Sequence, residues 1–235
     1  MEFVVHSESN LLTVQAQMNI VPQFATQILR VKKYVPTRAQ VAKIFESMNT
    51  TSCAVVGSSA SLLGCEHSKR ICEHGAVISV NDHPSVLALC NRVDVQYLNA
   101  HACYYNSKWY NSQSTLYASP QGMAVRPCFS RAKVRLRGEW NLHRLKRYAR
   151  SSWLSTGLED VLTKQGMGTG SPTSGGKAVS FAMGLCDSVA TYGIGSLGGA
   201  HLDSHDGMSA AHNASSEARW LRALHAQKKI VMRCV

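Results

Sequence analysis

The chain has 235 residues, of which 45% are hydrophobic, and it carries a formal net charge of +11. This length suits one α/β domain with a sizeable core, and the positive charge suits an anionic ligand. The sequence contains no run of about 18 apolar residues, and residues 1–30 lack the pattern of a signal peptide. We therefore expect a soluble domain, or a domain whose membrane anchor lies outside this sequence.

Eight cysteines are present, and none forms a Cys-x-x-Cys pair. This argues against a zinc finger and against a thioredoxin-type redox centre. The cysteines fit either disulfides in a secretory compartment or buried thiols in the cytosol. Basic residues concentrate between Arg126 and Arg150 but form no continuous arm, so nucleic acid is a minor alternative for the anionic partner.

Hydrophobic periodicity predicts helices and strands that alternate along the chain. Residues 1–34 show no clear period and are expected to form a lead-in, followed by a single domain over 35–235. Helices are predicted at 38–48, 62–73, 140–153, 156–164, from 171–174 to 185, and 217–227. Strands are predicted at 53–57, 76–80, 93–98, 115–118, 133–136, 189–192 and 229–233. The alternation predicts an α/β fold with a largely parallel central sheet flanked by helices.

Two strand-to-helix turns are rich in small and hydroxyl residues. Gly57-Ser-Ser59 follows the first buried strand, and Ser171-Pro-Thr-Ser-Gly175 opens the helix that ends near Leu185. Free backbone N–H groups and the helix dipole favour a phosphate at such a helix start. In a parallel sheet the loops after the strands share one edge, so we expect these turns to meet at a ligand site. From these residues alone, a polar-capped core helix is an equal alternative.

Neither turn matches a standard nucleotide motif. The first lacks the G-x-G-x-x-G fingerprint, and the second has Ser171 and Ala178 where a P-loop requires Gly and Ser or Thr. A metalloprotease motif is also absent, because the spacing of His201, His205 and His212 differs and Leu202 replaces the catalytic Glu. Zinc binding by the three histidines is a minor alternative.

His212 and Glu217 form a more informative pair. If His212 lies just before a helix, Glu217 falls in the first turns of that helix, near the imidazole. A carboxylate in that place raises the basicity of the ring and fixes its orientation, as a general base requires. The alternative is an exposed loop histidine.

Together these segments resemble the eukaryotic sialyltransferases, glycosyltransferase family 29. The large motif of that family is similar to the segment from Cys53 to Pro84, and its small motif to the segment from Ser171 to Gly195. His201 falls where the histidine of the third motif is expected. His212 and Glu217 match the very short motif, a His and a Glu separated by four residues. Arg92-Val-Asp94 is a looser match to the segment that follows the large motif.

The resemblance implies a Rossmann-like glycosyltransferase domain of the GT-A type that needs no metal or other cofactor. Such a domain transfers sialic acid from CMP-sialic acid to an acceptor glycan, with inversion, in the Golgi lumen. It implies His212 as the base and His201, or alternatively His205, as the group that steadies the departing phosphate. It also implies a disulfide between Cys53 and Cys186. The implied donor-binding residues are Gly57, Ser58, Ser59, Asn81, Ser171, Thr173, Ser174, Gly175 and Tyr192.

Two departures from the family pattern define the alternatives. Ser58 stands where the family usually has Asn, and Ser79 stands where an Arg is usual. CMP-Kdo is therefore an alternative donor. A degenerate member that binds nucleotide or glycan without turnover is the alternative function. In either case the expected partners are a nucleotide sugar and a glycan, not nucleic acid, and a membrane only through an anchor outside this sequence.

Overall fold

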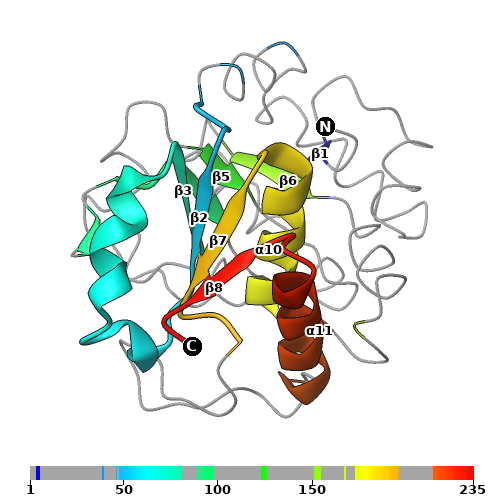
Figure 1. Ribbon diagram of the computed structural model, residues 1–235. Coiled ribbons are helices and arrows are strands. Elements are labelled where there is room, and N and C mark those ends of the chain that lie inside the picture. The colour runs from blue at the N-terminus through cyan, green and yellow to red at the C-terminus, as the bar shows by residue number, and fades with distance from the viewer. Residues whose placement is uncertain are drawn as a thin grey trace, which may run out of the picture.

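The computed structural model describes residues 4–5, 39, 46, 48–80, 89–90, 92–97, 123–125, 151–154, 167, 173–195 and 214–235. An eight-stranded sheet runs through them in the order β1-β6-β5-β4-β3-β2-β7-β8 (Figure 1). All neighbouring strands are parallel except β1 and β6, which pair in opposite directions. The predicted α/β fold with a largely parallel sheet is confirmed.

The elements have the following bounds. The strands are β1 (Val4–Val5), β2 (Cys53–Val56), β3 (Ala76–Val80), β4 (Val95–Tyr97), β5 (Met123–Val125), β6 (Ser151–Leu154), β7 (Val189–Tyr192) and β8 (Val231–Arg233). The helices are the 3-10 helices η2 (Ala60–Leu62) and η3 (Glu66–Glu73) and the α-helices α10 (Ser174–Leu185) and α11 (Ala214–Ala226). Within the described residues, no helix is long and apolar enough to cross a membrane.

The strand order changes direction at the centre of the sheet. From β2 the chain adds β3, β4, β5 and β6 in turn towards one edge, and β7 and β8 then extend the sheet on the other side of β2. In the β2–β7 pair, Cys53 lies beside Val189 and Val56 beside Tyr192, so both strands end at the same level. In open α/β sheets, ligands bind outside the carboxyl ends of the strands at such a reversal.

Both faces of the sheet centre are covered, which explains the uninterrupted apolar runs of β2 and β3. Val55 and Ile78 pack under α10 and α11 in one core cluster. Val56 and Val77 face the other way and pack with Ile71 of η3 in a second cluster. Figure 1 shows η3 on one side of the strands and α10 and α11 on the other.

Two predicted elements are wrong in detail. The helix expected at 62–73 is two 3-10 helices, which Gly64 separates with a left-handed φ of 75°. The helix expected at 140–153 is wrong over its last three residues, because residues 151–154 form β6, and the rest of that prediction lies outside the described residues. Pairing with β5 in the sheet outweighs the local helical spacing there. Strand β5 itself lies in a stretch for which no strand was predicted.

Other boundaries shift by a few residues. α11 begins at Ala214 instead of Glu217, and β4 and β8 are shorter than the strands predicted at 93–98 and 229–233. Ala39 and Glu46 are helical, as expected for 38–48. The strands predicted at 115–118 and 133–136 and the helix predicted at 156–164 lie outside the described residues.

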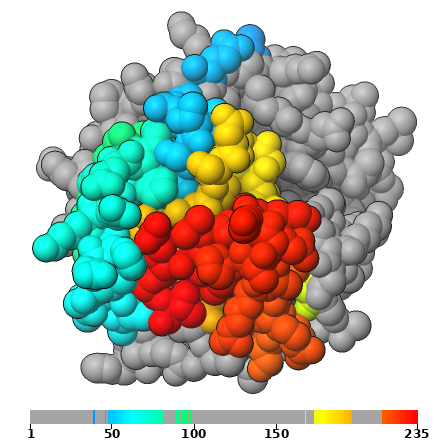
Figure 2. Space-filling model, viewed as in Figure 1, coloured from blue at the N-terminus to red at the C-terminus, as the bar shows by residue number. Residues whose placement is uncertain are grey.

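Within the described part of the chain, three disulfides join segments that are apart in sequence. Cys53 and Cys186, the pair that the resemblance implied, connect the start of β2 to the end of α10. The other two bonds are Cys65–Cys234 and Cys72–Cys90. The first of these holds the C-terminal segment beside η2 and η3, and Figure 2 shows these segments side by side on one face. Disulfides of this kind are typical of proteins in the secretory pathway.

Candidate functional site

The candidate site begins where β2 and β7 end at the reversal of strand order. The N–H of Gly57 donates to the carbonyl oxygen of Tyr192 at 2.8 Å, which continues the β2–β7 ladder past the last strand residue. A Cβ on Gly57 would lie 2.4 Å from the Gly193 carbonyl oxygen and 2.7 Å from Cγ1 of Ile194. The segments that follow β2 and β7 therefore touch closely at this point, and only glycine fits at position 57.

The start of α10 packs against this junction. Thr173 is the N-cap residue, and its hydroxyl accepts a hydrogen bond from the N–H of Gly176 at 3.1 Å. A Cβ on Gly175 would lie 3.1 Å from Cγ2 of Ile194. The structure thus brings Gly57 and the segment Thr173–Gly175 to the same edge of the sheet, as the sequence analysis expected of the two turns.

Glu217 of α11 is attached to the same helix start. Its side chain is only 6% exposed. One carboxylate oxygen accepts the N–H of Thr173 at 2.8 Å, and the other accepts the Thr173 hydroxyl proton. A carboxylate here also suits the positive end of the α10 dipole. Glu217 was predicted as the partner of His212, and the structure gives it a further role, which is to hold the first turn of α10.

Gly176 makes room for that carboxylate. A Cβ at this position would lie 2.7 Å from Oε2 of Glu217. Sequence reasoning did not single out Gly176. The signal was present, because two successive glycines in the first turn of a helix are unfavourable unless another group approaches closely.

The serine loop after β2 is buried. Ser58 and Ser59 are each 8% exposed. The Ser59 hydroxyl oxygen caps η2 by accepting the N–H of Ser61 at 3.2 Å, and the hydroxyl oxygens of the two serines lie 3.0 Å apart. Ser61 in turn donates to the carbonyl of Cys234. These bonds fix the loop against the C-terminal segment, so the loop is already shaped before a ligand binds.

Among the predicted donor-binding residues that the structure describes, Tyr192 has a side chain that lies away from the junction. Its ring is on the η3 face of the sheet, where its hydroxyl and Nε2 of His74 are 2.8 Å apart. Burial raises the pKa of the Tyr192 phenol. Burial also lowers the pKa of His74, and the Arg233 guanidinium lowers it further, so His74 is neutral at pH 7.

Arg92 and Asp94, the looser match that follows the large motif, make structural contacts with η3 and β3. Asp94 accepts the N–H of Val77 at 2.8 Å and forms an ion pair with Arg92 at 3.1 Å. Arg92 also donates to the carbonyl oxygens of His74 and Gly75. The pair therefore holds the end of η3 and the beginning of β3 in place, some distance in sequence from the candidate site.

Five predicted site residues lie outside the described residues. They are Asn81, Ser171, His201, His205 and His212. Their roles therefore stay predictions. Among the residues that the structure does describe, no group of three His, Cys, Asp or Glu side chains is placed to hold a metal ion. What the described part offers chemically to an anion is the start of α10, because the amides of Gly57 and Gly193 at the two strand ends already donate to the carbonyl oxygens of Tyr192 and Arg233.

No family model and no curated protein matches the sequence. Solved structures do match. One is the crystal structure of a mammalian sialyltransferase in complex with Gal-β-1-3GalNAc-ortho-nitrophenol, at a TM-score of 0.62 and 14% identity, covering 99% of this chain and 90% of that one. This chain therefore has a sialyltransferase-like fold. A second crystal structure of a mammalian sialyltransferase matches with a TM-score of 0.63 and 15% identity, over 99% of this chain and 89% of that one. The sialyltransferase fold expected from the motifs is thus confirmed.

Proposed function

We propose that this protein is a divergent member of the sialyltransferase family. It moves sialic acid, or a related acidic sugar such as Kdo, from a CMP donor to an acceptor glycan with inversion and without a metal. The observation that carries the proposal is the junction of Gly57, Gly193 and the start of α10 at the strand reversal of a sialyltransferase fold. In this proposal the donor's phosphate binds beside the start of α10, at the strand reversal outside which open α/β sheets bind their ligands.

The donor chemistry suits such a site. The leaving group is CMP, whose phosphate is already a stabilised anion, so amides and hydroxyls aimed at it replace a metal. In this proposal the amides of Ser174 and Gly175 and the hydroxyls of Ser171 and Ser174 bind the CMP and carboxylate region, while Thr173, whose N–H and hydroxyl are bonded to Glu217, shapes the helix start beside them. Ser59 and Asn81 contact the nucleotide. The net charge of +11 favours a donor that carries both a phosphate and a carboxylate.

His212 is the proposed base that removes the proton of the acceptor hydroxyl. A positioned base of this kind contributes roughly 10²–10⁴-fold to the rate. In the sequence, His212 stands two residues before Ala214, the first residue of α11. Glu217 links α11 to Thr173 at the start of α10, which supports a site that combines both segments. His201 or His205 steadies the departing phosphate.

The proposed setting is the Golgi lumen, where the three disulfides would form and persist. The acceptor is a glycan, and galactosides are the first to test because one similar structure was solved with Gal-β-1-3GalNAc-ortho-nitrophenol.

The test is release of CMP from CMP-sialic acid and from CMP-Kdo, with a panel of galactosides and EDTA. We expect release by the wild type and its loss in His212→Ala. His225→Ala is the matched control, since His225 lies on the exposed side of α11 and should leave release unchanged. Release that survives in His212→Ala would contradict the assignment of the base, and release that needs a divalent metal would contradict the mechanism.

The second candidate function is a binding protein without turnover. Ser79 favours it, because this residue is 3% exposed inside β3 where the family usually has an Arg, so a charged contact to the donor is absent. CMP binding without release from either donor would favour this candidate. No CMP binding at all would mean that only the fold is shared.

A further inference from the structure

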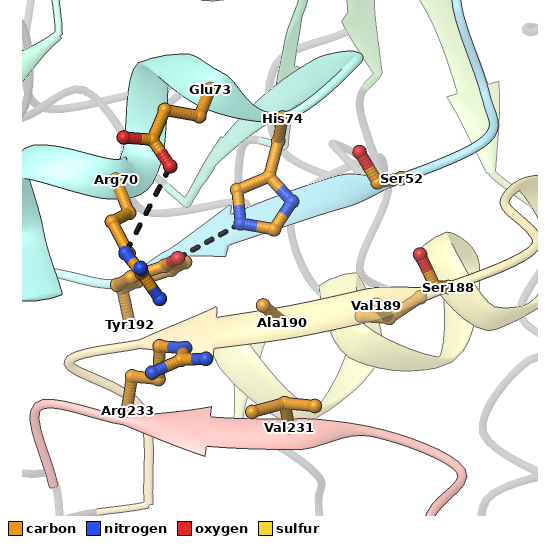
Figure 3. A pocket seen from close by; sticks show the side chains of 10 residues that line it. All are labelled: Ser52, Arg70, Glu73, His74, Ser188, Val189, Ala190, Tyr192, Val231 and Arg233. Atoms are coloured by element: carbon orange, nitrogen blue, oxygen red, sulfur yellow. Dashed lines mark hydrogen bonds and ion pairs between the residues drawn. The ribbon is translucent and has the colours of Figure 1, made fainter.

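A separate pocket lies on the η3 face of the sheet, opposite the face that α10 covers (Figure 3). It runs between the C-terminal part of η3 and strands β7 and β8, and it encloses about 270 Å³. This volume is just below the roughly 300–1,000 Å³ of typical ligand pockets, so it suits a small ligand. The pocket is distinct from the junction of Gly57 and α10, to which the CMP donor is assigned.

One end of the pocket is positively charged. Figure 3 shows the side chains of Arg70 and Arg233 approaching each other from η3 and β8, beside Tyr192. Arg70 pairs with Glu73 at 3.9 Å. Arg233 contacts Nδ1 of His67 at 3.2 Å and has no carboxylate partner within the described part of the chain. Glu73 thus pairs with one of the two guanidinium groups, and two guanidiniums that line one space favour an anion, above all a planar carboxylate.

The other end offers hydroxyl groups of complementary character. The Ser52 hydroxyl oxygen accepts the N–H of Gly75 at 3.0 Å, which leaves its proton to donate. The Ser188 hydroxyl donates to the carbonyl of Thr51 at 2.9 Å, which leaves its lone pairs to accept. In Figure 3 both hydroxyls lie at the end of the pocket away from the two arginines.

The floor between the two ends is apolar. It consists of the small side chain of Ala190 and the half-exposed side chain of Val231, which lie beside each other in the paired strands β7 and β8. At the charged end, Tyr192 and His74 line the pocket and are hydrogen-bonded to each other through the phenol hydroxyl. A charged end, an apolar floor and a hydroxyl end match the parts of a sugar ring that carries a carboxylate.

We propose that this pocket binds a single acidic sugar residue, with its carboxylate between Arg70 and Arg233 and its ring over Ala190 and Val231. The ring hydroxyls then reach Ser52 and Ser188. The site is additional to the proposed donor site, and the inference does not depend on transferase activity.

Glucuronate is a suitable probe, and glucose, which has the same ring without the carboxylate, is its neutral control. An NMR titration of the wild-type protein should show saturable binding of glucuronate and none of glucose. Arg233→Gln and Arg70→Gln should each weaken glucuronate binding about tenfold or more, as loss of one charged hydrogen-bonding partner predicts. Arg219→Gln is the matched control, because Arg219 is exposed on α11 and does not line the pocket. It should bind within about twofold of the wild type.

Several results would overturn the proposal. The first is absence of glucuronate binding to the wild type, and the second is unchanged binding in both pocket variants. Inorganic phosphate that binds as tightly as glucuronate would show an anion site without sugar recognition. Displacement of glucuronate by CMP would place the probe in the donor site. Arg70 is largely exposed, so Arg70→Gln keeps the test valid even if Arg233→Gln fails to fold.

Discussion

Replacing Glu217 by alanine removes the acceptor that holds the first turn of α10. Thr173 directs both its backbone N–H, at 2.8 Å, and its hydroxyl proton to the Glu217 carboxylate. Glu217 is 6% exposed, so water cannot easily take its place. The substitution therefore leaves two donors of Thr173 without a partner next to Gly176, together with the space that the carboxylate filled.

The magnitude follows from these contacts. A hydrogen bond to a charged group contributes about 1.5–3 kcal/mol, and loss of the favourable dipole interaction adds about 0.3–1 kcal/mol. The hydroxyl of Thr173 can turn to another acceptor, so the two bonds are not fully additive. We expect Glu217→Ala to lower the free energy of unfolding by about 2–4 kcal/mol. Glu217→Gln keeps one acceptor oxygen and loses the charge, so about half of that effect is expected.

Urea unfolding with the disulfides intact measures the effect. Fluorescence of the buried Trp220, one turn further along α11, reports on this region. Glu66→Ala is the matched control, since the Glu66 side chain is 88% exposed, and it should change stability by less than about 0.5 kcal/mol. A double-mutant cycle with Thr173→Ala isolates the contact between the two side chains.

Two results would refute this reasoning. One is a loss of less than about 0.5 kcal/mol in Glu217→Ala, within the usual range for surface substitutions. The other is strict additivity with Thr173→Ala, which would mean that the Thr173 hydroxyl and the carboxylate do not interact. If Glu217 instead acts only on His212, activity should fall in Glu217→Gln with no change in stability.

Three further predictions concern other parts of the structure. Gly57→Ala should destabilise the protein and abolish CMP binding, because the new Cβ would lie 2.4 Å from the Gly193 carbonyl oxygen. Gly184→Ala is the control: its Cβ would have no atom within 4 Å, so it should stabilise α10 by about 0.5–1 kcal/mol. Thermal unfolding and CMP titration distinguish the two. Because burial and Arg233 lower the pKa of His74 below its ordinary 6.5, the unfolded state binds its proton first, and stability should fall as pH drops below 6.5. Urea midpoints at pH 7.5 and 5.5 should differ less in His74→Gln, and an unchanged difference would exclude His74 as the cause. Replacing Cys186 by serine opens a loop of 133 residues and should lower the free energy of unfolding by about 5 kcal/mol. A decrease of less than about 1 kcal/mol in urea unfolding would count against a disulfide between Cys53 and Cys186.

Several elements could be predicted from the sequence because their signals are local. Strands β2, β3 and β7 are buried on both faces, so they appear as short apolar runs between polar turns. Helix α10 carries its own start signal in the hydroxyl of Thr173, which caps the helix as expected. The order of these elements, together with the motifs, was sufficient to predict the sialyltransferase fold.

Other features depended on contacts between segments far apart in the chain. Residues 151–154 form a strand because β5 lies beside them, and no local pattern reveals that neighbour. The bond between Thr173 and Glu217 joins positions 44 residues apart, and the pocket beneath η3 combines residues from four segments. Tyr192 and Gly193 are adjacent in sequence, yet the Tyr192 ring packs on the η3 face while the carbonyl oxygen of Gly193 faces Gly57 at the junction. The sequence alone predicted which segments carry the candidate site, and tertiary packing decided which of the described side chains meet there, because register and strand alternation are set by the whole sheet.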